Sequence, residues 1–555
     1  MRGADAVART LRAAGVTRIF TLSGNQIMPL FDACLEADID LMHVRQEAAA
    51  VHMADAWGRL TGQPGVALVT AGPGFANTLT GLYVATISES PLVLLSGCAP
   101  MGQHAKGAFQ AMAQAEIASH VSKASWTAES PSGLPNDIRK ALDIATSGRP
   151  GPVHIALPFD TIDGEVESPE DALVSDGVES SSERIIDDAD AAHVLSELRA
   201  AKSPIILAGS MMMRGDGPSI LADLSTASGA PVVQMESPRG TNDPALGAFA
   251  EVLAEADLIA LIGKKLDFTL KMGASPDVRP DCRFIQIDPD SSAIDLTRRN
   301  VGDEQRVALS IVADPLPSTR RIVELATGHV PESGWADEVN SAVSYRPASW
   351  TDMRAEQGQP LHSYEVAAAI QSYLDEDPTS IFICDGGEWG QWAQACITAP
   401  TRILNGPAGS IGTSIPFALA ARLARPDARI VTVLGDGTAG FHIMEYDTAV
   451  RYDIPFIAVV GNDAAWNAEF QIQLREYGDE RLVGCELLPS RYDSVVEALG
   501  GHGENVDSAN NLAQALERAG ASSLPALVNV NLARDAAPVV RRGTDAPQAS
   551  SAMLH

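Results

Sequence analysis

Short apolar runs alternate with amphipathic stretches along most of this chain. The first 160 residues contain five such runs, at 16–22, 39–45, 65–71, 91–97 and 151–157. Apolar runs of this length are typical of buried strands, and the amphipathic stretches between them are typical of helices. Strands that alternate with helices predict an open α/β sheet whose strands are largely parallel.

The same pattern returns twice along the chain. Residues 190–330 contain apolar runs at 204–209, 231–235, 258–263 and 284–290. Residues 361–535 contain runs at 381–387, 429–437, 455–463 and 525–532. We therefore predict an α/β protein of three doubly wound parallel-sheet domains, at residues 1–165, 190–330 and 361–535.

Two segments differ from these domains in composition. Residues 161–190 are acidic and contain a run of serines, which is typical of a linker. Residues 536–555 are rich in Ala, Pro, Ser and Arg, and we expect a flexible tail there.

Charge and composition narrow the class of partner. The chain has 71 acidic and 40 basic residues, a net charge of −31, so we expect no nucleic-acid partner. The sequence contains no run of about 18 uninterrupted apolar residues, so we expect no membrane span. The six cysteines form no C-x-x-C pair, and the N-terminus lacks a signal-peptide pattern. These features favour free thiols in a reducing cytoplasm.

The strongest chemical signal lies where the predicted strand at 429–437 ends. This strand delivers Gly435-Asp436-Gly437, and the next one delivers Asn462-Asp463. Ligands bind at the carboxyl ends of strands in open parallel sheets, and glycines let backbone amides approach a phosphate. Asp436 would hold a hard cation that bridges to phosphate oxygens, and Asp463 follows it by 27 positions. A GDG turn alone is weak, but this spacing favours a phosphate–metal site over a plain turn.

A second signal is Glu47, in the segment RQEAAAVHMADAWGR. This glutamate falls where a predicted strand ends and a predicted helix begins. Its carboxylate could serve in catalysis, but acidic residues are also favoured at helix starts because of the helix dipole. Alone, Glu47 therefore leaves both interpretations open.

Together these segments resemble the thiamine diphosphate-dependent decarboxylase and carboligase family, which includes acetolactate synthase and benzaldehyde lyase. The resemblance runs from about residue 5 to about residue 535, and its matching segments occur in the family's order. Besides the GDG and glutamate segments, these are 66–85, 148–158 and 409–424. The resemblance implies thiamine diphosphate and Mg2+ as cofactors. It also identifies residues 1–165 as a pyrimidine-binding domain, 190–330 as a middle domain and 361–535 as a diphosphate-binding domain.

The resemblance assigns roles at the cofactor. Glu47 would hydrogen-bond the aminopyrimidine ring, the Gly409 carbonyl would accept from its amino group, and Ile411 would hold the cofactor bent. Asp436 is the expected first metal ligand. Asp463 and the Ala465 carbonyl are the expected others, although the family usually has Asn-Asn where this chain has Asn462-Asp463, so Asn462 is the fallback ligand. The remaining expected cofactor-binding residues are Gly387, Glu388, Gly435 and Gly437.

Further residues match substrate-side positions of the family. Gln110 matches an active-site glutamine, and Glu469 matches an active-site glutamate. Gln26 stands where benzaldehyde lyase has a catalytic histidine, and it cannot make the same proton transfer. Each of these polar residues could instead be an ordinary surface group.

The middle domain says least about function. Family members bind FAD or ADP there, and Lys264, Lys265 and Arg239 could meet phosphates or be surface cations. FAD stays open as an alternative that these residues do not support. Arg541-Arg542 could meet the phosphates of coenzyme A.

The resemblance leaves three functions to compare. The first is an acetolactate-synthase-like lyase or carboligase that acts on 2-keto acids or 2-hydroxy ketones. The second is a 2-hydroxyacyl-CoA lyase or oxalyl-CoA decarboxylase. The third, a non-catalytic regulatory paralogue, is disfavoured because Glu47 and the GDG turn are intact. The resemblance also implies a homodimer or homotetramer with active sites shared between subunits.

Overall fold

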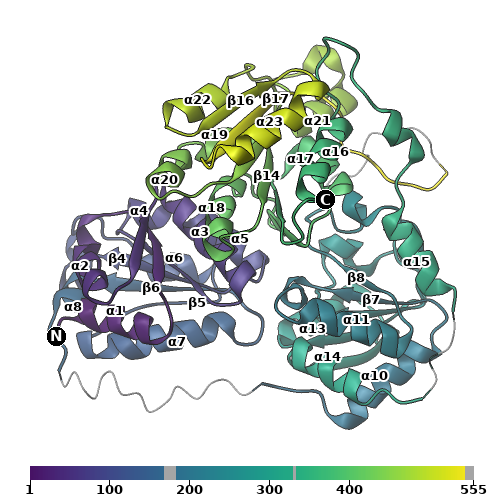
Figure 1. The fold of residues 1–555 in the computed structure, drawn as a ribbon. Helices are drawn as coiled ribbons and strands as arrows, with labels where there is room; N and C mark the ends of the chain where they lie inside the picture. The colour runs from purple at the N-terminus through teal and green to yellow at the C-terminus, as the bar shows by residue number, and fades with distance from the viewer. Residues whose placement is uncertain (168–182, 329, 331–332, 544–555) are drawn as a thin grey trace. The chain divides into compact units, whose positions relative to one another are not determined.

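The computed structural model describes residues 1–167, 183–328, 330 and 333–543. Its strands form three sheets, and all the strand pairings in them are parallel (Figure 1). The predicted fold class, three α/β domains built on parallel sheets, is therefore confirmed.

The first sheet has the strand order β2-β1-β3-β4-β6-β5. Its strands are β1 (Arg18–Thr21), β2 (Asp40–His43), β3 (Gly65–Val69), β4 (Leu92–Cys98), β5 (Ala124–Thr127) and β6 (Pro152–Pro158). The helices are α1 (Gly3–Ala13), α2 (Met28–Glu36), α3 (Glu47–Thr61), α4 (Pro73–Ala76), α5 (Leu79–Ile87), α6 (Gln114–Ser119), α7 (Leu134–Thr146) and α8 (Phe159–Asp163).

The middle sheet has the order β11-β10-β9-β7-β8. Its strands are β7 (Pro204–Ala208), β8 (Val232–Gln234), β9 (Leu258–Ile262), β10 (Arg283–Asp288) and β11 (Val307–Val312). The helices are α10 (Asp188–Ala200), α11 (Gly217–Ser228), α12 (Phe249–Leu253), α13 (Ser291–Val301), α14 (Pro315–Glu324) and α15 (Trp335–Ser344). Two separate apolar clusters lie in this region, as expected for a parallel sheet that is buried on both faces.

The third sheet has the order β13-β12-β14-β15-β17-β16. Its strands are β12 (Ile381–Cys384), β13 (Thr401–Leu404), β14 (Ile430–Gly435), β15 (Ile457–Asn462), β16 (His502–Val506) and β17 (Ala526–Asn531). The helices are α16 (Ser363–Leu374), α17 (Gly387–Cys396), α18 (Ser414–Ala424), α19 (Asp436–His442), α20 (Glu445–Arg451), α21 (Asn467–Tyr477), α22 (Tyr492–Ala498) and α23 (Ala509–Ala521).

The chain divides into two compact units. The first contains Met1–Ser182 together with Ile415–Asp427 and His442–Pro455, and the second contains the rest. Helix α20 therefore belongs to the unit of the first sheet. Within that unit the backbone N–H of Arg45 donates to the Glu445 carboxylate of α20, at 3.0 Å. This contact anchors the turn that leads into α3.

Residues 533–543 run back over the second unit. Trp392 of α17 donates from Nε1 to the carbonyl of Ala536 at 2.8 Å. Arg542 forms ion pairs with Glu251 of α12, at 2.7 Å, and with Glu338 of α15. The expected flexible tail began at residue 536, and its residues 544–555 lie outside the described residues. Among the described residues, no helix is both long and apolar enough to cross a membrane.

Candidate active site

Two carboxylates lie close together at the carboxyl edge of the third sheet. Gly435, the last residue of β14, pairs with Gly461 of β15. Asp436 begins α19 directly after β14, and Asp463 follows the last residue of β15. Both aspartates line one cavity of about 760 Å³. The two oxygen side chains that the sequence spacing paired are therefore brought to one site.

The electrostatics of this pair are suited to a bound cation. Burial raises the pKa of Asp436 to about 6, although backbone N–H groups of Gly437 and the loop after β15 oppose the shift. Burial and the charge of Asp436 raise the pKa of Asp463 to about 7. Asp436 is 1% exposed, and its Oδ2 has no hydrogen-bond partner among the described residues. A divalent cation bound through oxygen fits this arrangement.

The protein offers few other ligands for such a cation. Among the residues that the structure describes, no group of three or more His, Cys, Asp or Glu side chains could hold a metal. Two carboxylates and a backbone carbonyl would leave the other coordination positions to phosphate and water. That division of ligands is the one typical of Mg2+ sites at phosphorylated ligands.

The two residues considered as the second metal ligand, Asn462 and Asp463, have different surroundings at the end of β15. Asp463 lines the cavity, and its Oδ1 accepts from the backbone N–H of Ala465 at 3.1 Å. The side-chain amide of Asn462 instead donates to the carbonyl of Ser490 at 2.8 Å and to Asn529 at 3.1 Å. In this geometry Asn462 is part of the packing between strands, and Asp463 faces the cavity.

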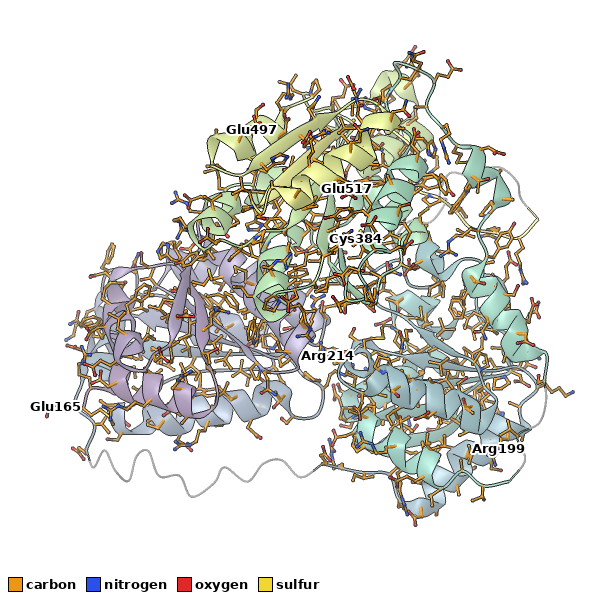
Figure 2. The ribbon with its side chains drawn as sticks, in the orientation of Figure 1. Glu165, Arg199, Arg214, Cys384, Glu497 and Glu517 are labelled. Carbon is orange, nitrogen blue, oxygen red and sulfur yellow. The ribbon has the colours of Figure 1, made fainter. Side chains whose placement is uncertain are left out.

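A buried aspartate ties together two glycine-bearing loops. Cys384, labelled in Figure 2, ends β12, and Asp385 follows it. The carboxylate of Asp385 accepts from the backbone N–H groups of Gly386, Gly412 and Ser414, at 2.9, 3.0 and 3.2 Å. Burial raises the pKa of Asp385, and these donors oppose the shift.

Asp385 thereby holds the loops that carry three predicted residues. Gly387 begins α17 with a φ of +86°, and Gly409 has a φ of +67°. Gly387, Gly409 and Ile411 all line the cavity. Sequence reasoning did not single out Asp385, although it lies near the end of the predicted strand at 381–387, where site residues are expected.

Two glutamates also line this cavity. Glu388, in the first turn of α17, is buried, and its carboxylate accepts from the backbone N–H of Ala537. Burial raises the pKa of Glu388. Glu469 lies in the first turn of α21 and is exposed. The two predicted acids thus have different surroundings, since Glu388 is buried against Ala537 and Glu469 is exposed.

Glu47 is the first residue of α3, as the strand–helix pattern predicted. The side chain of Gln46 caps this helix by accepting from the backbone N–H of Ala48 at 2.6 Å. The amide of Asn77 donates to Glu47 Oε2 at 2.9 Å. Asn77 lies at the end of α4 and was not singled out from the sequence.

The turn before α4 collects the other predicted residues of the first domain. Gln26 accepts from the Thr70 hydroxyl at 2.8 Å. Gly72 has a φ of +59°, and a Cβ placed on it would lie 2.9 Å from the Cβ of Gln110. Only glycine fits there. The turn at Gly72 therefore lies beside Gln26 and Gln110. Asn77, which follows this turn, connects it to Glu47.

The basic residues considered as phosphate ligands differ in whether protein groups already bind them. Lys264 is buried and donates to the hydroxyl of Thr269 at 2.6 Å, so protein groups already engage it. Arg239 lines the 760 Å³ cavity and also a neighbouring one of about 310 Å³. Arg542, a candidate for coenzyme A phosphates, is engaged by Glu251 and Glu338.

Comparison with known protein families matches three successive parts of the chain. Residues 1–117 match the N-terminal TPP binding domain of thiamine pyrophosphate enzymes, residues 191–322 match their central domain, and residues 385–530 match their C-terminal TPP binding domain. The three matches occur in the same order as the three sheets.

Individual relatives resemble the chain over nearly its whole length. A probable acetolactate synthase of Mycobacterium bovis is 32% identical over 547 residues, which cover 96% of this chain and 95% of the relative. 2-Hydroxyacyl-CoA lyase 2 of Homo sapiens is 29% identical over 593 residues, covering 96% of this chain and 90% of the relative. A 2-hydroxyacyl-CoA lyase of Arabidopsis thaliana is 28% identical over 556 residues, covering 94% of each chain.

Proposed function

Since this chain belongs to the family of thiamine pyrophosphate enzymes, and so uses thiamine diphosphate, we propose that it makes or breaks a carbon–carbon bond next to a carbonyl. Its proposed substrates are 2-keto acids or 2-hydroxy ketones, as for an acetolactate synthase. The observation that carries the cofactor part of this proposal is the Asp436–Asp463 pair, which lines the cavity at the carboxyl edge of the third sheet.

The diphosphate end of the cofactor is assigned to the third domain. Asp436, Asp463 and the carbonyl of Ala465 would hold Mg2+, whose positive charge would offset the negative charge of the diphosphate. The glycines of the cavity let the backbone approach those oxygens closely. The cavity-lining residues proposed for this end are Gly387, Gly435, Asp436, Gly437 and Asp463. Gly409 and Ile411 would contact the cofactor between its two ends.

The pyrimidine end is assigned to Glu47. When bound, thiamine diphosphate supplies a carbon that attacks a carbonyl and a ring that accepts the electron pair released when the adjacent bond breaks. Glu47 would share a proton with a pyrimidine ring nitrogen, since a carboxylate at the start of α3 is held in place by Asn77. The glycine turn that contacts Glu47 also brings Gln26 and Gln110 to this region, and we assign these two to the substrate.

The substrate region of the third domain is assigned to the cavity wall formed by α17 and α21. Glu469 is exposed in this wall, whereas Glu388 is buried and accepts from the backbone N–H of Ala537. An exposed carboxylate can exchange protons with solvent and pass them to a substrate oxygen. Glu469 is therefore the proposed proton-transfer residue on this side, and Glu388 the proposed cofactor contact.

The proposed working form is a homodimer or homotetramer in the cytoplasm. Glu47 belongs to the first domain and Asp436 to the third, so a site needs both domains. We propose that one subunit supplies Glu47 and its partner supplies Asp436, which gives two equivalent sites per symmetric dimer.

A second candidate activity is cleavage of 2-hydroxyacyl-CoA thioesters. The observation that favours it is the similarity to 2-hydroxyacyl-CoA lyases of Homo sapiens and Arabidopsis thaliana over nearly the full chain. Such a substrate carries phosphate groups, and Arg239 is a cation on the cavity wall that could meet one.

A substrate panel tests the proposal. The protein is dialysed against EDTA, reloaded with Mg2+ and thiamine diphosphate, and given pyruvate, benzoin or a 2-hydroxyacyl-CoA. We expect acetolactate from pyruvate or benzaldehyde from benzoin, only after reloading and not with Glu47→Gln. Cleavage of the thioester alone would select the second candidate. No product from any of the three by the reloaded protein would refute both.

A further inference from the structure

The segment after β17 reaches the loop that carries the proposed metal ligands. Arg534 donates from Nε to the carbonyl of Asp463 at 2.9 Å and from a terminal nitrogen to the carbonyl of Ala464 at 2.9 Å. One guanidinium group thus binds two consecutive carbonyls of the loop. Its planar fork of donors is suited to such paired acceptors.

These two bonds fix the direction of two backbone N–H groups. A trans peptide is planar, so its N–H points opposite to its C=O. Holding the carbonyls of Asp463 and Ala464 toward Arg534 therefore turns the N–H groups of Ala464 and Ala465 the other way. Those N–H groups are hydrogen-bond donors to Asp436, and that of Ala465 also donates to Asp463 Oδ1 at 3.1 Å.

The loop needs such a restraint because its backbone is strained. Ala464 has a φ of +54°, a conformation that residues with a side chain rarely adopt. Two further backbone bonds hold the same loop: Leu487 N–H donates to the Ala464 carbonyl, and Trp466 N–H donates to the Cys485 carbonyl, both at 2.8 Å. Without its partners the loop would relax and redirect its N–H groups.

Arg534 is itself held in place. Its guanidinium lies 5.0 Å from the centre of the Phe470 ring in α21, and it forms an ion pair with Glu486 at 3.3 Å. The carbonyl of Arg534 accepts from the Gln471 amide at 2.9 Å. A residue held by Phe470 and Glu486 through its side chain and by Gln471 through its backbone can impose its geometry on the loop.

We propose that Arg534 is a positioning residue for the metal site: it sets the two peptide planes that aim the loop's N–H groups at the aspartates. The inference rests on the proposed function, because it assigns the loop to a divalent cation. Charge alone would act in the opposite direction, since a nearby guanidinium repels a cation and removing it would strengthen cation binding.

The test measures Mn2+ binding by electron paramagnetic resonance, in the presence of thiamine diphosphate and without turnover. We expect Arg534→Met and Arg534→Lys to weaken Mn2+ binding about 10- to 100-fold, because Met has no donor and the Lys ammonium lacks the rigid planar fork that sets both peptide planes. Arg518→Met is the matched control, since Arg518 pairs with Glu504 in the same domain at 2.8 Å and should leave binding unchanged.

The two variants separate geometry from charge. If Arg534→Lys binds Mn2+ like the wild type and Arg534→Met binds it equally or more tightly, the positioning role is wrong. If Arg534→Met does not fold, Arg534→Lys decides alone. If the wild type binds no Mn2+ with thiamine diphosphate, the proposed function fails, and the inference fails with it.

Discussion

At the scale of single residues, the surroundings of Glu47 depend on one neutral amide. Asn77 donates to Glu47 Oε2 at 2.9 Å and so helps to fix the direction of this carboxylate. The pyrimidine nitrogen and Asn77 would then bind the same carboxyl group. Asn77 should therefore influence how Glu47 is presented to that nitrogen.

Replacing this amide by a carboxylate should disturb Glu47 strongly. In Asn77→Asp the amide donor is lost and the new carboxylate repels Glu47, so we expect kcat/KM to fall at least about tenfold. The measurement is kcat/KM with Mg2+ and thiamine diphosphate in excess. Asn511→Asp, which adds the same charge at an exposed position of α23, should leave kcat/KM unchanged. An unaltered kcat/KM for Asn77→Asp would contradict this role.

Only some residues of the site could be found from the sequence. Glu47, Asp436 and Asp463 are identifiable because each follows a predicted strand within a short motif. Asn77 contacts Glu47 from 30 positions away, and Arg534 contacts Asp463 from 71 positions away. Such contacts depend on tertiary packing, which no local pattern encodes. The hydrogen-bond partners of a buried oxygen, such as Asp436 Oδ2, also depend on how the chain folds around it.

At the scale of elements, central strands were predictable and several edge strands were not. Every strand missed by the sequence pattern lies at the end of its sheet: β5, β11, β13 and β16. An edge strand has one neighbour and is partly exposed, so its apolar run is interrupted, as in HGENV of β16. Central strands such as β14 are buried along most of their length and therefore read as continuous apolar runs.

Three neighbouring strands of the first sheet are joined by a buried histidine. The ring nitrogens of His154 on β6 hydrogen-bond the hydroxyls of Ser96 on β4 and Ser125 on β5, both at 2.8 Å. Burial lowers the pKa of His154 from 6.5 to about 3. The folded chain therefore keeps this imidazole neutral where the unfolded chain would protonate it.

The sign of the resulting pH dependence follows from this lowered pKa. The stability that neutral His154 contributes is present above about pH 6.5 and is lost as the pH falls toward 3. Between pH 7 and 4.5 the wild type should lose about 2–3 kcal/mol more unfolding free energy than His154→Gln, which cannot titrate. Urea unfolding of the first unit at both pH values measures this difference. Equal losses in the two proteins would show that His154 is not the titrating group.

At the scale of the whole molecule, the chain distributes its chemistry over separate domains. The family models match all three, and relatives at about 30% identity cover more than 90% of the chain. Glu47 stands in the first domain, whereas Asp436 and Asp463 stand in the third. One thiamine diphosphate site would therefore need both domains, and we propose that two partner subunits supply them.

Mixing two inactive variants tests this central claim most directly. Glu47→Gln should abolish activity while the fold persists, and Asp436→Ala should abolish metal and cofactor binding. In a mixed dimer, one site would carry both defects and the other site neither. With Mg2+ and thiamine diphosphate present, we predict that activity partly returns, at up to one working site per mixed dimer. If mass measurements show that subunits exchange and activity stays at zero, the two carboxylates do not serve one site shared between subunits.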